Sequence, residues 1–182
     1  MNKQVEQKIP GVIYELVEPI VEADNITKEV FIRRPTGVDM REMPLPEDPA
    51  PIDKKITLFS ALTGLTPKIL DEMLGDDFDA IDEIVGEMMM EGEKRRAQNG
   101  VLKLLYPTPE LTQITVRRPR AKDYKIRPTN PQSTGDTYAY IGVLTGLEEQ
   151  VIDGFDAADI VAITAVVENS KEKKKKRYRR IL

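Results

Sequence analysis

The 182-residue sequence contains no cysteine, no histidine and no tryptophan. Without cysteine there is no disulfide and no thiolate nucleophile, and without histidine there is no imidazole base, metal ligand or pH switch near neutrality. Phosphate-binding loops, dinucleotide fingerprints and nucleophile elbows are missing as well. The sequence therefore gives no positive reason to expect an enzyme, a catalytic residue, a cofactor or a bound metal.

Long apolar runs are also missing. No run approaches the roughly 20 residues of a membrane-spanning helix, and the polar start Met1-Asn2-Lys3-Gln4 is unlike a secretory signal. We therefore expect a cytosolic protein without membrane association. Hydrophobic residues make up 40% of the chain, which is enough for a modest core.

Charge is unevenly distributed along the chain. The whole sequence carries −4, but residues 171–182 hold eight Lys and Arg against one Glu, which leaves −11 for residues 1–170. An acidic body repels phosphate groups and so disfavours nucleic acid as a partner. We interpret the basic tail as a solvated, disordered end, and binding of nucleic acid or an acidic partner through it is the alternative.

Several short motifs occur twice in the same order. Arg33-Arg34-Pro35 followed by Asp39 recurs 84 positions later as Arg117-Arg118-Pro119 followed by Asp123. Leu62-Thr63-Gly64-Leu65 recurs 82 positions later as Leu144-Thr145-Gly146-Leu147, and at the same spacing Asp77 falls on Asp159. Upstream of these, Gly11-Val12-Ile13 is similar to Gly100-Val101-Leu102. This recurrence predicts a domain-sized module present twice.

Each half has the same expected order of elements. Residues 12–17 and 29–32, and again 101–106 and 113–116, have the composition of a β-hairpin. Proline-rich loops follow at 43–52 and 127–135. Helical patterns over 54–63 and 136–145 then end at Gly64 and Gly146, which is typical of a left-handed C-cap, and a short and a final helix follow.

The predicted fold class is therefore α+β, with two pseudo-repeated modules, each a β-hairpin followed by about three short helices. We expect a first module over 1–92, a charged connector over 93–99, a second module over 100–170, and the basic tail over 171–182.

Carboxylates cluster where each final helix begins. Asp76, Asp77 and Asp79 open the first, and Asp156 and Asp159 open the second. Acid–base catalysis or cation binding is one interpretation, but the ligand register of a calcium loop is absent. Capping of the free amides at a helix N-terminus explains these residues and is favoured.

The paired arginines also allow two interpretations. Arg33-Arg34 and Arg117-Arg118 have the chemistry of an anion site. Internal ion pairs with the nearby Asp39 and Asp123 are the favoured alternative, because neighbouring strand residues face opposite sides.

In this order, the motifs resemble the tail assembly chaperones of Mu-like and P2-like contractile phages. The resemblance is carried in the first half by Arg33, Arg34, Pro35, Asp39, Leu62, Thr63, Gly64, Leu65 and Asp77. In the second half it is carried by Arg117, Arg118, Pro119, Asp123, Leu144, Thr145, Gly146, Leu147 and Asp159. Members of that family are usually single modules, so this chain would be a tandem duplicate.

The resemblance implies a non-catalytic role. Such chaperones bind the tape measure protein, shield its apolar stripe and deliver tail tube subunits to it in the host bacterial cytoplasm, and they are absent from the mature virion. Lys173-Lys174-Lys175-Lys176 would be encoded by an A-rich run that suits ribosomal frameshifting, so a longer product of the same gene is a further candidate partner.

Apolar residues of the helices are the candidates for binding that partner. They are Phe59, Leu62, Leu65, Ile69 and Met73 in the first half, and Ile141, Leu144, Leu147, Val151 and Phe155 in the second. Most of them are expected to build the core instead, since a module this small has few apolar residues to spare. Two other functions remain open: a minor tail or baseplate protein that stays in the virion, and a nucleic-acid-binding phage regulator that uses the basic tail.

Overall fold

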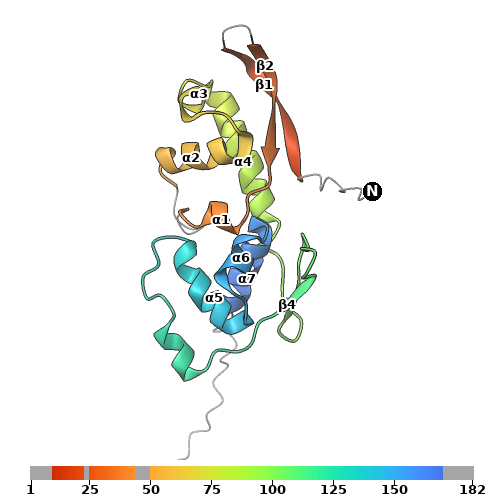
Figure 1. Ribbon diagram of the computed structural model, residues 1–182, viewed down its shortest axis with the longest axis vertical. Helices are drawn as coiled ribbons and strands as arrows, with labels where there is room; N and C mark the ends of the chain where they lie inside the picture. Colours follow the sequence, from red (N-terminus) through yellow and green to blue (C-terminus); the bar gives the residue numbers. More distant parts are fainter. Residues whose placement is uncertain (1–9, 23–24, 44–49, 170–182) are drawn as a thin grey trace, which may run out of the picture. The chain divides into compact units, whose positions relative to one another are not determined.

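The computed structural model describes residues 10–22, 25–43 and 50–169, which form a mixed α+β fold as predicted (Figure 1). The chain divides into two compact units. Unit 1 contains the described residues of Met1–Pro35 and Pro49–Met88, and unit 2 contains those of Thr36–Asp48 and Met89–Leu182. This division differs from the predicted modules, because the segment after the first Arg-Arg-Pro belongs to unit 2. The predicted tail over 171–182 lies outside the described residues.

Unit 1 is a long hairpin with helices on one side. Strands β1 (Gly11–Glu22) and β2 (Asn25–Arg33) are antiparallel and are followed by α2 (Ile52–Thr63), α3 (Pro67–Asp71) and α4 (Gly75–Met90). Helix α2 packs against β2 and α3. The buried side chains of the unit are Leu16, Val30, Ile32, Ile56, Leu58, Phe59, Leu62, Leu70, Ile81, Val85 and Met88. The strand members of this set alternate along the chain, as expected for a sheet with one buried face.

The end of β2 is fixed by a buried arginine. The Arg34 amide donates to the carbonyl of Pro10 at 3.0 Å, and its guanidinium donates to the carbonyl of Met88 at 2.9 Å. Met88 lies in the last turn of α4, where carbonyls lack helical partners and favour a cation. Arg34 therefore ties the hairpin to the helix end.

Unit 2 contains short elements around a larger core. They are α1 (Gly37–Met40), β3 (Val101–Lys103), β4 (Gln113–Thr115), the 3₁₀ helices η1 (Ala121–Lys125) and η2 (Gly135–Thr137), α5 (Tyr138–Thr145), α6 (Glu149–Asp153) and α7 (Ala157–Asn169). Strands β3 and β4 pair antiparallel but are shorter than predicted, and Pro107 and Pro109, which have no amide donor, follow β3. The core of unit 2 consists of Leu102, Leu104, Ile114, Val116, Tyr138, Tyr140, Ile141, Leu144, Ile152, Phe155, Ile160, Ala162, Ile163 and Val167. None of the described helices is long and apolar enough to cross a bilayer.

The segment that contains α1 is built into unit 2. The Gly37 amide donates to the carbonyl of Phe155 at 2.8 Å, and the Tyr138 hydroxyl donates to the carbonyl of Gly37 at 2.7 Å. A Cβ atom at position 37 would lie only 2.2 Å from the carbonyl oxygen of Ile152, so the close approach requires glycine.

A charged cluster completes this attachment. The Arg41 guanidinium donates to both carboxylate oxygens of Asp153, at 2.6 and 3.0 Å, and to Glu149 at 3.3 Å. The same guanidinium lies 5.1 Å from the centre of the Tyr138 ring. Arginine is the only basic residue that can bind a carboxylate in a bidentate manner and at the same time stack on an aromatic ring.

The recurring Leu-Thr-Gly-Leu motif ends α2 and α5 in the same way. Gly64 and Gly146 have φ of 76° and 79°, so the predicted left-handed C-caps are confirmed. The Thr63 hydroxyl donates to the Phe59 carbonyl and accepts from the Leu65 amide. In α5 the corresponding bonds of Thr145 go to Ile141 and Leu147. The motif therefore forms a helix C-cap.

Candidate functional site

Asp77, in the first turn of α4, shapes the first hairpin. Strand β1 has four residues, Leu16 to Pro19, opposite the single Lys28 of β2, so it bulges out of the ladder. The amides of Val17 and Glu18 in this bulge donate to the Asp77 carboxylate at 2.8 and 3.1 Å, and the Tyr14 hydroxyl donates to it at 2.8 Å. The carboxylate thus replaces the strand partners that the bulge removes.

These contacts correct the predicted role of Asp77. Burial alone would raise the pKa of its carboxyl, but the hydrogen bonds from Val17, Glu18 and Tyr14 together lower that pKa below its usual value. Its hydrogen-bond partners are groups of β1 about 60 residues away in the chain, and not the amides of its own helix. The capping interpretation was therefore wrong for this residue.

Asp159 makes the same kind of contact in unit 2. The amides of Leu105 and Tyr106 donate to its carboxylate at 2.7 and 3.0 Å. Burial, together with the nearby Asp156 carboxylate, raises the pKa of Asp159 above its usual value, although these two hydrogen bonds act to lower it. Asp156, by contrast, accepts from the Ala158 amide at 2.9 Å and caps α7 as predicted.

The contacts of Asp77 with β1 and of Asp159 with Leu105 and Tyr106 show which residues of the two hairpins correspond. They place Leu105 at the position of Val17, and therefore Val101 at the position of Ile13. Strand pairing agrees, since Ile13 pairs with Phe31 and Val101 pairs with Thr115. This alignment differs by one residue from the match between Gly11-Val12-Ile13 and Gly100-Val101-Leu102 that the sequence suggested.

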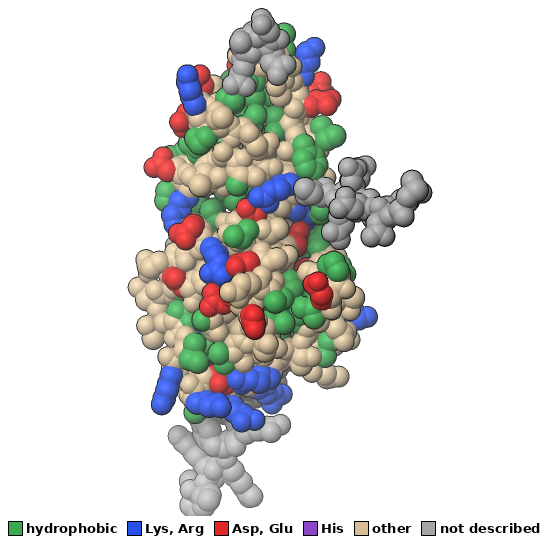
Figure 2. All heavy atoms as spheres, viewed as in Figure 1, with side chains coloured by type: hydrophobic (Ala, Val, Ile, Leu, Met, Phe, Trp, Pro, Cys, Tyr) green, Lys and Arg blue, Asp and Glu red, His purple; other side chains and the backbone are tan. Residues whose placement is uncertain are grey.

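The unburied side of the first hairpin is apolar with an acidic centre. Opposite the buried Leu16, Val30 and Ile32, five exposed side chains form what we call the outer face: Ile13, Glu15, Val17, Glu29 and Phe31. Ile13 and Val17 are 66% and 67% exposed. Glu15 pairs directly with Glu29, one step along the ladder from the Ile13–Phe31 pair. Figure 2 shows hydrophobic and acidic side chains close together at the surface in the hairpin region.

Gly11 holds the aromatic ring of the outer face. A Cβ atom at position 11 would lie 2.6 Å from the Phe31 ring, so the ring lies directly over the glycine. Cross-strand packing of an aromatic ring onto a glycine orders the ring. Phe31 is therefore presented to solvent in a defined position.

The corresponding side of the second hairpin is different. The aligned positions are occupied by Val101, Lys103, Leu105, Gln113 and Thr115. Lys103 stands where the first hairpin has Glu15, and Thr115 stands where it has Phe31. The combination of exposed apolar groups and two carboxylates thus occurs on the hairpin of unit 1 and not on that of unit 2.

The apolar residues named as candidates for partner binding, most of them expected in the core, fall into two groups. Five are in the cores of the units and are inaccessible in this structure: Phe59, Leu62, Ile141, Leu144 and Phe155. Leu65, Ile69, Met73 and Leu147 are half-buried, and Val151 is exposed. Leu147 also lines an open groove of unit 2 with Ile126 and Val143. The outer face was not predicted, although the run from Val12 to Val17 has apolar residues at both strand alternations, which is a signal for two apolar faces.

The Arg-Arg-Pro motifs have structural contacts. Arg117 donates to both oxygens of Asp123 at 2.6 and 3.0 Å, which confirms the predicted ion pair in the second half. The Arg117 guanidinium and the Arg120 amide hold the pKa of Asp123 far below its usual value. In the first half Asp39 accepts from the amide and hydroxyl of Thr36, at 2.8 and 2.9 Å. Of the remaining motif residues, Pro35 is buried, Pro119 and Arg33 are half-buried, and Arg118 is exposed.

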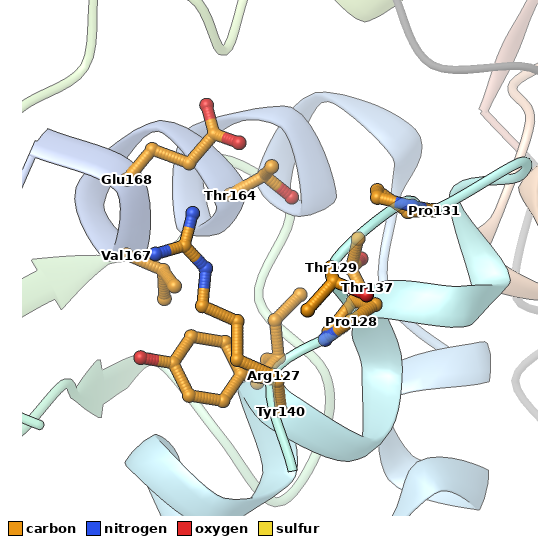
Figure 3. Close-up of a pocket in the computed structure, with 10 residues that line it drawn as sticks. Arg127, Pro128, Thr129, Pro131, Thr137, Tyr140, Thr164, Val167 and Glu168 are labelled. Carbon is orange, nitrogen blue, oxygen red and sulfur yellow. The ribbon is translucent and has the colours of Figure 1, made fainter. Parts of the chain in front are cut away.

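Unit 2 contains a small pocket of about 230 Å³ between α5, α7 and the loop at 127–131 (Figure 3). The Arg127 side chain extends into it toward Thr164 and Glu168. The buried hydroxyl of Thr164 has no hydrogen-bond partner, so Glu168 does not activate it as a base would. The described residues also contain no group of three acidic side chains arranged to hold a metal ion. The pocket therefore provides hydrogen-bonding groups but no assembled catalytic pair.

A protein-family model matches part of the chain. Residues 14–90 match the model of a family described as phage tail assembly chaperone proteins, E, or 41 or 14. This stretch covers most of the first hairpin, α1, α2, α3 and α4, including four of the five outer-face residues. No curated protein and no solved structure matches the chain.

Proposed function

We propose that this protein is a non-enzymatic phage tail assembly chaperone that binds the tape measure protein and helps to recruit tail tube subunits. The observation that carries the proposal is the family match over residues 14–90. An exposed, ordered apolar face within that stretch supports it, because such faces on small proteins usually serve protein–protein contact. On this proposal the protein acts in the host cytoplasm and is absent from the mature virion.

We further propose that the chain is a tandem duplicate of a chaperone module of the Mu-like or P2-like type. Support comes from contacts that recur in both halves, namely the carboxylates of Asp77 and Asp159 on strand amides and the left-handed glycines at 64 and 146. The different outer surfaces of the two hairpins suggest that the copies have different partners, with a tail tube subunit or the longer frameshift product as candidates for the second.

The test is co-expression with the tape measure protein of the same phage. The full chain should raise the soluble fraction of that protein several-fold and should co-purify with it, whereas an unrelated acidic protein of similar size should do neither. An unchanged soluble fraction together with no co-purification would overturn the proposal.

Mass spectrometry of purified particles gives the second readout. A chaperone should be absent from the particles, whereas stoichiometric amounts in them would show a minor tail or baseplate protein instead. Salt-sensitive DNA binding that disappears when residues 171–182 are removed would favour the regulator.

A further inference from the structure

We infer that the outer face of the first hairpin binds an α-helix of another polypeptide that presents a Lys or Arg between two apolar residues, at positions i, i+4 and i+8. The inference rests on the proposed function only for the identity of the protein that carries this helix. Its basis is the chemistry and the spacing of the five outer-face residues.

The charge of the partner follows from Glu15 and Glu29. Like charges directly opposite one another on paired strands destabilise a hairpin, so this pair weakens unit 1. Both carboxylates lie between exposed apolar groups, with Ile13 and Phe31 on one side and Val17 on the other. A purely apolar partner would bury two unpaired charges, which is costly. A cation placed over the pair would remove the repulsion and satisfy both groups.

The helical form of the partner follows from distances. Ile13 and Glu15 lie two residues apart on the extended part of β1, about 6.6 Å along the strand, and Val17 follows them in the bulge, where this regular spacing ends. On one face of an α-helix, residues i, i+4 and i+8 are spaced by about 6 Å, with about 12 Å from first to last. The first apolar residue and the basic residue of such a helix therefore match the spacing of Ile13–Phe31 and Glu15–Glu29, and the second apolar residue continues toward the exposed Val17. A partner strand would instead pair with a hairpin edge and would depend little on these side chains.

The surface is ordered before any partner arrives. Asp77 fixes the bulge that carries Val17, and Gly11 seats the Phe31 ring. Preorganisation of this kind lowers the entropy lost on binding. The second hairpin, with Lys103 and Gln113 at the carboxylate positions, has neither the charge nor the aromatic ring for the same ligand.

The experiment uses the full chain and a synthetic, fluorescein-labelled helical peptide of about 18 residues, with Leu at i and i+8 and Lys at i+4. Matched peptides carry Glu or Gln at i+4. Fluorescence anisotropy should show the Lys peptide binding at least tenfold more tightly than the Glu peptide, with a preference that declines as salt is raised. Equal affinity for the Lys and Glu peptides would overturn the inference.

Variants of the chain locate the site. Glu15→Lys with Glu29→Lys should reverse the preference, so that the Glu peptide now binds more tightly. Glu72→Lys with Glu83→Lys changes the net charge equally at two exposed helical-region positions outside the hairpin and should leave the preference unchanged. Ile13→Thr with Phe31→Thr makes both apolar positions of this pair polar, as Thr115 is at the position of Phe31 in the second hairpin, and should weaken binding of the Lys peptide at least tenfold. Circular dichroism checks that each variant is folded, and unchanged peptide binding by a folded hairpin variant would overturn the site.

The two proposals fail differently. If no peptide binds but the chain still solubilises the tape measure protein, the inference about the outer face is wrong and the chaperone function stands. If the Lys peptide binds with the expected charge reversal but the tape measure protein is neither solubilised nor bound, the surface is confirmed and the chaperone function is wrong.

Discussion

Replacing Asp77 with alanine should selectively loosen the first hairpin. The substitution removes the acceptor for the amides of Val17 and Glu18 and for the Tyr14 hydroxyl, at 2.8, 3.1 and 2.8 Å. A hydrogen bond to a charged group contributes about 1.5–3 kcal/mol, but three bonds to one carboxylate are not additive and water can reach the exposed bulge. We therefore expect a loss of about 3 kcal/mol in the free energy of unfolding of unit 1.

Two measurements check this expectation. Urea unfolding followed by circular dichroism gives the loss of stability, and amide hydrogen exchange by NMR should show faster exchange at Val17 and Glu18 specifically. The pH dependence gives a further test of mechanism. Because the pKa of Asp77 is lowered in the folded protein, its contribution is present above the unfolded value of 3.8 and is lost as the pH falls below it. The stability difference between the native chain and Asp77→Ala should therefore shrink as the pH falls below about 4.

Asp79→Ala is the matched control, because Asp79 is exposed on the same helix. It should change stability by less than about 0.5 kcal/mol. If Asp77→Ala were as mild as this control, or if the amides of Val17 and Glu18 kept their protection, the carboxylate would not be what holds the bulge.

Three further substitutions probe unit 2. Gly37→Ala should lower the free energy of unfolding in urea by about 2 kcal/mol or more, since its Cβ would meet the Ile152 carbonyl. Gly75→Ala, where a Cβ has open space, should be near neutral. Equal effects of the two substitutions would refute the close approach at Gly37. Arg41→Met keeps an unbranched apolar stem but loses the bidentate contact with Asp153, so the free energy of unfolding should fall by about 1 kcal/mol, and by less at high salt. For Asp159, whose pKa is raised, the folded protein binds the proton more tightly, so the native chain should gain stability relative to Asp159→Asn as the pH falls from 7 toward 4. A trend of the opposite sign in pH-dependent unfolding would contradict that assignment.

Local features of the chain were predictable from sequence. The glycines at 64 and 146 end their helices in the left-handed conformation, because the motif itself contains the hydrogen-bonding threonine and the glycine. The Arg117–Asp123 pair spans only six residues and was predicted for the same reason. Information that lies within one helical turn or one tight loop can be read without knowledge of the tertiary structure.

Long-range features were not predictable in the same way. The role of Asp77 depends on a strand about 60 residues away, and a carboxylate at the start of a helix has the same sequence signature whether it caps that helix or holds another element. The outer face was missed because the periodicity of β1 shows which residues share a face but not which face the helices cover. Helical apolar residues such as Phe59 were candidates for partner binding although most were expected in the core, and sequence could not separate the two groups because burial is decided by packing.

The location of α1 has a consequence for how the protein is made. Gly37 and Arg41 are bonded to residues 101 and 112 positions further along the chain. At a translation speed of about 5–20 residues per second, this segment leaves the ribosome roughly 5–20 s before its counterparts exist. Unit 2 therefore cannot reach its native form until α7 has been synthesised, whereas the last residue of unit 1 is Met88, which is made well before that point.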